Sequence, residues 1–300
     1  MGLGPPMMAL FKFMHDQGLF STIRSVAEIG SQEYDTKLPE YDGFLDRFFK
    51  GVGSDTPQTV DPENGRFKGP ASEYFRRLGC DYVSFDIDGR FGAIPFDLNY
   101  DKVGPERRHS ATLTTNLGTT EHVVDQVACF RTIHELTAPG GYMVHALPLN
   151  NYVNHGLYSY SPAFFEALAA ANDYELMGMW MTVKPHWNLL PPALKPWPPK
   201  ASLLICLLRR TTDAEFVLPL QLSNPMMVQA DLGARYKVTE RRAEKNNWNV
   251  PVRYDGLIKV DVEAMTSTLV EDYAEILSQI MPKKPVKAAK PDKALALEKS

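Results

Sequence analysis

Cysteine is scarce in this chain. Cys80, Cys129 and Cys206 are widely spaced, and no two of them form a Cys-x-x-Cys pair. An odd and scattered set of thiols argues against a disulfide framework and against a zinc knuckle. We therefore interpret the three thiols as small buried groups, and we expect a reducing compartment, the cytoplasm.

Long apolar runs are also lacking. The most apolar stretch, residues 203–208, has the length of a β-strand, whereas a helix needs about 20 apolar residues to cross a bilayer. The apolar N-terminus is interrupted by Lys12, His15 and Asp16 and has no small-residue cleavage site. We therefore expect neither a signal peptide nor a membrane partner.

A net positive charge is absent from all but the end of the chain. Residues 282–300 carry six lysines against Asp292 and Glu298, so this tail holds four net positive charges. Since the whole chain has a formal net charge of -4, the remainder carries eight net negative charges. An acidic body repels phosphate backbones, so we do not expect a nucleic-acid substrate. The tail, rich in Lys, Ala and Pro, is predicted to be disordered.

Strand-like and helix-like segments alternate through the central part of the chain. Strands are expected at 25–29, 81–87, 93–98, 110–116, 142–147, 175–183 and 201–208, and helices at 7–20, 71–78, 123–136 and 161–171. Such alternation is typical of an α/β fold with a doubly wound, mostly parallel sheet. Only a proline-rich loop separates the last two strands, so the final strand can run antiparallel at the sheet edge.

The pattern divides the chain into one domain with additions. We predict an N-terminal helical extension over 1–20 and a domain over 21–210, with an irregular insertion at about 34–70. Residues 211–281 form a C-terminal extension. It includes a helix over 262–280, indicated by an apolar stripe that contains Met265, Leu269 and Ile276.

Polar residues follow the predicted strands where a ligand would lie. In an open parallel sheet, ligands bind beyond the carboxyl ends of the strands, near the point where the strand order reverses. Residues 28–32, Asp86, Asp97 and residues 116–122 hold these positions. A carboxylate such as Asp86 can accept hydrogen bonds from both hydroxyls of a ribose, with Asp88 as the alternative. The first turn has a single glycine, so no Gly-x-Gly-x-x-Gly dinucleotide motif is present.

Four segments together resemble the class I S-adenosylmethionine-dependent methyltransferases. They are 26–32, 85–88, 94–99, and 116–122 continuing to the Leu-Thr-Ala-Pro-Gly-Gly of 136–141. The resemblance spans about residues 20–210. It implies a Rossmann-like, seven-stranded, mostly parallel sheet with an antiparallel edge strand. It also implies S-adenosylmethionine as cofactor and a methyltransferase domain over 21–210.

The resemblance implies roles for the residues at the strand ends. Glu28 and Gly30, followed by Ser31, would lie by the methionine part of the cofactor, and Asp86 by its ribose. Asp97 would lie by the adenine amine, and Asn116 to Gly118 along the cofactor's floor. Gly30 and Asp86 are 56 positions apart, whereas about 20 is typical of nucleotide-binding units, so the insertion must loop out.

Histidines are the candidates for the acceptor side. If the acceptor is a hydroxyl, a general base assists methyl transfer, and histidine is the usual base near neutral pH. We select His122 as catalytic, with Glu121 fixing it or holding substrate; the alternative is a helix-start histidine bonded to backbone. His145, inside an apolar strand, is interpreted as a core residue. His155 lies in an aromatic loop that lines the pocket or forms a surface turn.

No metal ion is expected, because neither a His-x-His nor a His-Glu-x-x-His spacing occurs. The predicted function is S-adenosylmethionine-dependent methylation of a small molecule, with O-methylation expected. Two alternatives stay open: an NAD(P)-dependent oxidoreductase on a similar sheet, and an inactive methyltransferase-like binding protein. The acceptor and the oligomeric state are not predicted.

Overall fold

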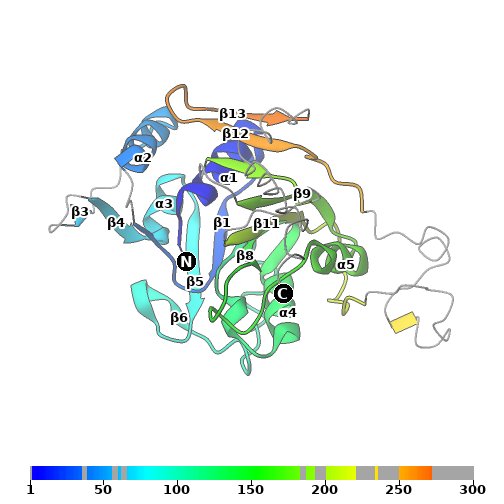
Figure 1. Ribbon diagram of the computed structural model, residues 1–300. Coiled ribbons are helices and arrows are strands. Elements are labelled where there is room, and N and C mark those ends of the chain that lie inside the picture. The colour runs from blue at the N-terminus through cyan, green and yellow to red at the C-terminus, as the bar shows by residue number, and fades with distance from the viewer. Residues whose placement is uncertain are drawn as a thin grey trace, which may run out of the picture.

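A mixed β-sheet with helices on both faces forms the centre of the molecule (Figure 1). The computed structural model describes residues 2–35, 39–55, 60–61, 66–182, 187–192, 201–220, 234–235 and 250–271. The sheet's strands are β1 (Ser25–Ile29), β5 (Asp81–Asp86), β6 (Ile94–Pro95), β7 (Ala111–Leu117), β8 (Thr137–Asn150), β9 (Glu175–Thr182), β10 (Asn188–Leu190), β11 (Ser202–Arg209), β12 (Leu257–Asp261) and β13 (Thr266–Val270).

The strand order confirms the doubly wound α/β class. From edge to edge it reads β13-β12-β10-β9-β11-β8-β7-β1-β5-β6. The segment from β8 to β6 is parallel throughout. After β1 the chain builds β5 and β6 on one side and then returns to build β7 and β8 on the other. The carboxyl ends of β1, β5 and β7 therefore meet at the point where the strand order reverses, which is where ligands bind in such sheets.

The sequence suggested that the antiparallel strand lies at the sheet edge, but the structure places it inside the sheet. β11 is antiparallel to both β8 and β9 and lies between them. Residues 202–208 are all buried, which fits a strand covered on both faces better than an edge strand. Three further strands, β10, β12 and β13, extend the sheet beyond β9, so it has ten strands where seven were expected.

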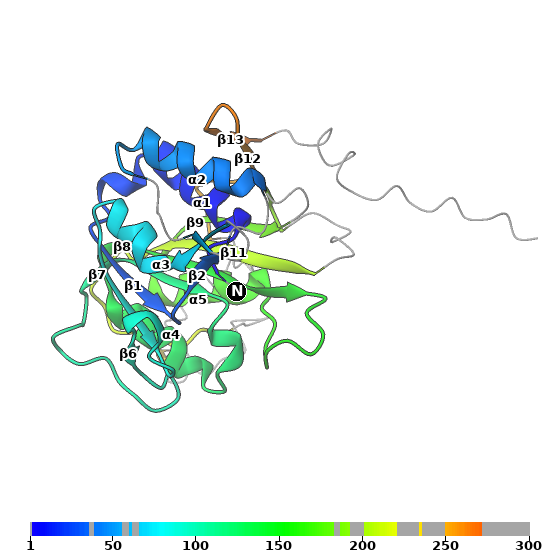
Figure 2. The same ribbon diagram turned by 90° about the vertical axis from the view of Figure 1, so that its left-hand side faces the viewer.

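Helices cover the two faces of the sheet (Figure 1, Figure 2). One face packs against α1 (Pro5–Asp16), α2 (Pro39–Gly51) and α3 (Ala71–Arg77), and the other against α4 (Gln126–Leu136) and α5 (Pro162–Asn172). Alternate side chains of β11 enter the two cores: Ile205 belongs to the first, and Leu204 and Cys206 to the second. None of the described helices is both long and apolar enough to cross a membrane.

Helix α4 begins three residues later than the apolar pattern predicts. Asp125 precedes its first residue, and the Asp125 side chain accepts a hydrogen bond from the Ala128 N–H at 2.8 Å. This is N-capping, which satisfies one of the free N–H groups of the first turn. The residues before it, Thr120–His122, form a separate 3-10 turn, η3, so they stay outside the helix at the end of β7.

The insertion after β1 contains regular structure of its own. It includes α2 and a small sheet in the order β2-β4-β3, formed by β2 (Glu33–Asp35), β3 (Val60–Asp61) and β4 (Arg66–Pro70). β1 and β5 are nonetheless direct parallel neighbours. The insertion therefore loops out of the main sheet, as the strand-end assignment requires.

The helix predicted over 262–280 is wrong for its described part. Thr266–Val270 is strand β13, paired antiparallel with β12, and residues 272–280 lie outside the described residues, as does the predicted tail 282–300. Met265 and Leu269, spaced four apart, also pack against the core from a strand hairpin. The pairing with β12 therefore decides the structure here. The division of the chain into a domain and extensions stays a prediction.

The N-terminal helix is packed into this same body. α1 contacts β10, β12 and β13. Asp16 Oδ2 at its end accepts the Ser267 backbone N–H at 2.9 Å and the Ser267 hydroxyl at 2.7 Å. Phe13 packs edge-on against Tyr254, with ring centroids 5.1 Å apart. These contacts fix α1, and with it the first residues of the chain, beside the sheet.

A buried arginine satisfies the end of α4. Arg210, 1% exposed, donates through Nη1 to the carbonyl oxygens of His134 at 2.9 Å and Thr137 at 2.7 Å. The last carbonyls of a helix lack partners within it, and a cation there also complements the helix dipole. Arg210 therefore fastens α4 to the end of β11.

We predict that Arg210→Leu lowers the free energy of unfolding by roughly 2–4 kcal/mol, because buried carbonyls lose a charged donor. Urea unfolding followed by circular dichroism measures this change. Arg209→Leu is the matched control, since the Arg209 side chain is 41% exposed and such surface changes stay within about 0.5 kcal/mol. Equal stability of the two variants would contradict the role of Arg210.

Candidate functional site

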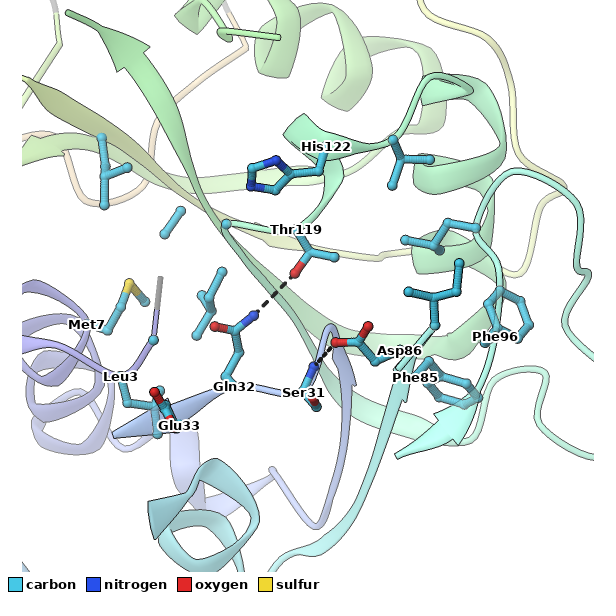
Figure 3. Close-up of a pocket in the computed structure, with 18 of the residues that line it drawn as sticks. Leu3, Met7, Ser31, Gln32, Glu33, Phe85, Asp86, Phe96, Thr119 and His122 are labelled. Carbon is cyan, nitrogen blue, oxygen red and sulfur yellow. Dashed lines mark hydrogen bonds between the residues drawn. The ribbon is translucent and has the colours of Figure 1, made fainter. Parts of the chain in front are cut away.

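A cavity of about 730 Å³ opens at the carboxyl ends of β1, β5 and β7. This volume lies within the range of small-molecule sites, roughly 300–1,000 Å³. Its walls come from the turns that follow these strands and from the segment that leads into α1 (Figure 3). The cavity therefore occupies the position that the strand order predicts for a ligand.

The turn after β1 is pressed against the turn after β7. Gly30 has φ 87°, and a Cβ there would lie 2.2 Å from Thr119 Oγ1 and 2.8 Å from Gln32 Nε2, so only glycine fits. The Thr119 hydroxyl donates to the Ile29 carbonyl at 2.9 Å and accepts from Gln32 Nε2 at 3.2 Å (Figure 3). Thr119 was not selected from the sequence; its signal is the Gly-Thr-Thr turn that follows β7.

Ser31 and Asp86 meet at the cavity wall. The Ser31 backbone N–H donates to Asp86 Oδ2 at 2.6 Å, a contact drawn in Figure 3. Asp86 Oδ1 accepts a long bond from the Asp88 N–H at 3.4 Å. Both Ser31 and Asp86 line the cavity. The first turn and the end of β5 thus hold this carboxylate in place at the pocket.

Asp97 and Gly118 also line the cavity, as the sequence assignment requires. Asp97 Oδ1 accepts the Asn99 backbone N–H at 2.9 Å and its Nδ2 at 3.2 Å, which fixes the loop after β6. Gly118 follows β7 directly and has φ 83°, a conformation that favours glycine. With Ser31 and Asp86, these residues surround one side of the cavity.

Glu28 is not among the lining residues. Its carboxylate is fully buried and accepts hydrogen bonds from the Gln32 N–H at 3.0 Å, the Thr115 hydroxyl at 3.4 Å and the Tyr82 hydroxyl. Burial raises the pKa of Glu28 to about 7. Glu28 therefore supports the first turn from beneath, and any effect on a cofactor would pass through the Gln32 backbone.

Asn116 is likewise behind the wall. Its Nδ2 donates to Thr120 Oγ1 at 2.9 Å, and its Oδ1 accepts the Thr120 N–H at 3.3 Å. The side chain is fully buried. Asn116 therefore shapes the η3 turn, while Gly118 lines the cavity. The assignment to cofactor binding stays a prediction for all seven residues: Glu28, Gly30, Ser31, Asp86, Asp97, Asn116 and Gly118.

The acceptor-side candidates come together beside the cavity. His122 lines it, with its imidazole half-exposed, and Glu121 beside it is fully buried. His155, from the loop after β8, reaches the same place: its Nε2 and that of His122 each lie 3.8 Å from Glu121 Oε1. The two imidazole rings are 5.1 Å apart. From the sequence, the loop that carries His155 could either line the pocket or form a surface turn. In the structure, His155 lies beside His122.

Burial controls the charges in this group. It raises the pKa of Glu121 to about 7, and it lowers the pKa of His122, which the neighbouring His155 lowers further. The lowered pKa favours the neutral form of the His122 imidazole. His145, by contrast, is buried within β8, and burial lowers its pKa to about 3, so its interpretation as a core residue is confirmed.

Residues at the start of the chain complete the cavity. Leu3 and Met7 line it, and Figure 3 shows both beside the turn after β1. The Leu3 N–H donates to the Glu33 carbonyl at 2.9 Å, which ties this segment to β2. No local sequence signal marks Leu3 or Met7 as site residues, because their position depends on the packing of α1.

We predict that Glu28→Gln changes how stability depends on pH. A carboxyl whose pKa rises from 4.5 in the unfolded chain to about 7 in the folded one stabilises the fold when protonated. That contribution is present below about pH 4.5 and is lost as pH rises through 7, by roughly 3 kcal/mol. In Glu28→Gln the decline in unfolding free energy between pH 5 and pH 8 should be smaller by up to that amount.

The measurement is urea unfolding at pH 5 and pH 8 for the wild type and Glu28→Gln. Glu106→Gln is the control, because the Glu106 side chain is 69% exposed and makes no buried contact of this kind. Glu106→Gln should show the same decline in unfolding free energy between pH 5 and pH 8 as the wild type. An equal decline in all three proteins would show that Glu28 does not carry the proton in the folded state.

A family model described as a methyltransferase domain matches residues 65–193. The comparison with curated proteins found no match. Among solved structures, the chain is similar to the Burkholderia thailandensis 1,6-didemethyltoxoflavin-N1-methyltransferase, with 12% identity, coverage of 70% of this chain and 79% of that one, and a TM-score of 0.40.

It is also similar to an O-methyltransferase from a trans-AT polyketide synthase multienzyme of Brevibacillus brevis, in complex with S-adenosyl-L-homocysteine. The identity is 10%, the coverage 69% and 73%, and the TM-score 0.39. A third similar structure is a 16S rRNA (adenine(1408)-N(1))-methyltransferase from Catenulisporales acidiphilia, with 6% identity, coverage of 70% and 93%, and a TM-score of 0.36. At these identities and TM-scores, structural similarity does not indicate which acceptor this chain uses.

The family match and the strand order together show that the chain carries a methyltransferase domain over the matched residues, 65–193. It is an S-adenosylmethionine-dependent methyltransferase, and S-adenosylmethionine is its cofactor. The residues present fit this cofactor, because the cavity has the size of a small-molecule site and the Asp86 carboxylate in its wall is a hydrogen-bond acceptor of the kind that ribose hydroxyls need. The nicotinamide-dependent alternative is not supported.

Proposed function

We propose that this methyltransferase acts on a small molecule and methylates a hydroxyl oxygen. The observation that carries the proposal is the shared cavity. Asp86 with Ser31 lines one wall, and His122 comes from another (Figure 3). A ribose acceptor and a neutral imidazole in one cavity suit a cofactor and a hydroxyl acceptor side by side.

On the cofactor side, Asp86 would accept the ribose hydroxyls and Asp97 the adenine amine. Among the described residues, both hydrogen bonds to the Asp97 carboxylate fall on Oδ1, which leaves Oδ2 for that contact. Gly118 would let the backbone approach the ligand. The cofactor supplies an electrophilic methyl group on a sulfonium sulfur, and the protein's main task is to align the acceptor with it.

On the acceptor side, the cavity wall is largely apolar. Leu3, Met7, Ala146 and Leu203 line it, and the described residues around the cavity include the carboxylates of Glu33, Asp86 and Asp97 but no lysine or arginine. Such a wall suits an uncharged, partly apolar molecule. It is a poor surface for the phosphates of a nucleic acid, which supports a small-molecule acceptor. The three cysteines are buried and unpaired, which supports a cytoplasmic location.

His122 would act directly on the acceptor. As a general base it accepts the hydroxyl proton at a ring nitrogen while the oxygen takes the methyl group, and S-adenosylhomocysteine is released. As an orienting group it holds the same oxygen in line. Glu121, 3.8 Å from His122 Nε2, would fix the ring or hold substrate.

We predict that Asp86→Ala weakens S-adenosylhomocysteine binding by roughly 1–3 kcal/mol, the cost of losing a hydrogen-bonded charged partner. Isothermal titration calorimetry measures the affinity. Asp81→Ala is the matched control, because Asp81 lies at the opposite, exposed end of β5 and should leave the affinity unchanged. Unchanged binding in Asp86→Ala would move the ribose contact to Asp88.

We predict that His122→Ala lowers turnover by about 10²–10⁴-fold while S-adenosylhomocysteine binding stays near wild type. The measurement pairs titration calorimetry with a release assay for S-adenosylhomocysteine on a panel of phenols, hydroxy acids and polyols. His109→Asn is the control, a half-exposed histidine 3.2 Å from Asp213 and away from the cavity.

Lost turnover with intact binding supports the role of His122 in chemistry. Loss of both would make His122 a structural residue. The wild type could also bind the cofactor and turn over amines or carboxylates but no hydroxyl acceptor. That result would contradict O-methylation and assign the enzyme to another acceptor class.

A further inference from the structure

Glu121 is an unusual carboxylate. Its side chain is fully buried, and neither oxygen accepts a hydrogen bond from the described residues. Buried carboxylates normally receive several donors, because an uncompensated buried charge is costly. Glu28 illustrates the normal case, with three hydrogen bonds to its oxygens. The bare carboxylate of Glu121 therefore calls for a partner.

Two imidazoles face this carboxylate. His122 Nε2 and His155 Nε2 each lie 3.8 Å from Glu121 Oε1, which is too long for a hydrogen bond. One nitrogen or oxygen atom from each of the three residues lies within 4.8 Å of the other two. Protonating both rings would place two cations side by side, so imidazolium partners do not satisfy the arrangement well.

The backbone holds the three residues together. The Glu121 carbonyl accepts the Leu157 N–H at 2.6 Å and the Tyr158 N–H at 3.3 Å. Gly156 has φ 72°, and a Cβ there would lie 2.8 Å from Glu121 Cγ. The loop after β8 is therefore docked directly on η3, and the absence of a side chain at Gly156 permits the close approach. The position of His155 beside His122 follows from this contact.

We propose that Glu121, His122 and His155 form a binding site for a divalent transition-metal ion of the Zn²⁺ type. Two histidines and one glutamate are a known ligand set of catalytic zinc sites, which keep a further position open. Imidazole nitrogens favour Zn²⁺ and its neighbours, whereas Mg²⁺ prefers oxygen ligands.

The geometry is close to what such an ion needs. Ligand atoms about 2.1 Å from a tetrahedral ion stand about 3.4 Å apart, and the two oxygen–nitrogen separations here are 3.8 Å. The imidazoles, 50% and 43% exposed, can rotate by the small amount required. No metal motif is visible in the sequence, because the three residues come from two loops that only the fold brings together.

The position beside the cavity gives the ion a use. Since His122 lines the cavity, the open coordination position would be within reach of an acceptor oxygen. His122 would then orient the acceptor through the metal rather than act as a free base. This use rests on the proposed function, whereas the metal site itself does not.

The test titrates Co²⁺ into the untagged, chelator-treated full chain and follows its visible absorption, with Zn²⁺ as competitor and Mg²⁺ as comparison. We expect one Co²⁺ per chain, displaced by Zn²⁺ and not by Mg²⁺. Glu121→Gln and His155→Ala should each weaken Zn²⁺ binding by more than about 10-fold, the lower bound seen even for outer-shell partners. His109→Asn should leave it unchanged.

Titration of the same variants with S-adenosylhomocysteine tests whether the fold and the cofactor cavity are intact. If Glu121→Gln fails to fold, His155→Ala carries the test alone, because the His155 ring is partly exposed. Absence of the Co²⁺ band, or Zn²⁺ binding unchanged in the folded variants, overturns the metal site and leaves His122 as a base. Metal binding without methylation of any hydroxyl acceptor overturns the proposed function and leaves the metal site standing.

Discussion

The close approach of Gly30 to Thr119 is the constraint on which the rest of the site depends. A Cβ at Gly30 would lie 2.2 Å from the Thr119 hydroxyl, so the turn after β1 can rest on the turn after β7 only with glycine there. On one side of this contact, the next residue, Ser31, reaches Asp86 with its N–H. On the other side, the residues after Thr119 are η3, which carries Glu121 and His122. One steric contact thus sets the spacing between the cofactor side and the acceptor side.

Two buried glutamates near this contact differ in how their carboxylates are hydrogen-bonded. Glu28 and Glu121 are both fully buried, and burial raises the pKa of each to about 7. Glu28 is satisfied by three donors, so its hydrogen-bonding capacity is used within the fold. Glu121 has no such donors among the described residues and instead faces two imidazole nitrogens. Although both carboxylates are buried, Glu28 therefore supports a turn, whereas the Glu121 oxygens keep lone pairs that can bind a ligand.

The sequence predicts what depends on local pattern and misses what depends on distant pairing. Strand β1 is found at the predicted residues, and Asp86 and Asp97 line the cavity, because strand periodicity and strand ends are local features. The interior position of β11 depends instead on pairing with both β8 and β9. β13 forms because β12 is available to pair with it. His155 joins the site because its loop docks on η3.

In the proposed function, the parts of the chain outside the parallel sheet would determine which acceptor can enter. The proposed cofactor contacts come from the parallel sheet: Asp86 is the last residue of β5, Asp97 lies in the loop after β6, and Gly118 follows β7 directly. The apolar wall opposite includes Leu3 and Met7, which belong to the segment around the start of α1. The Leu3 N–H bonds to the Glu33 carbonyl of β2, and a Cβ at Gly2 would lie 2.0 Å from that oxygen. This tight junction seats the N-terminal segment against β2. In the proposed function, the sheet would therefore hold the methyl donor, while the N-terminal segment and β2 would shape the space left for the acceptor.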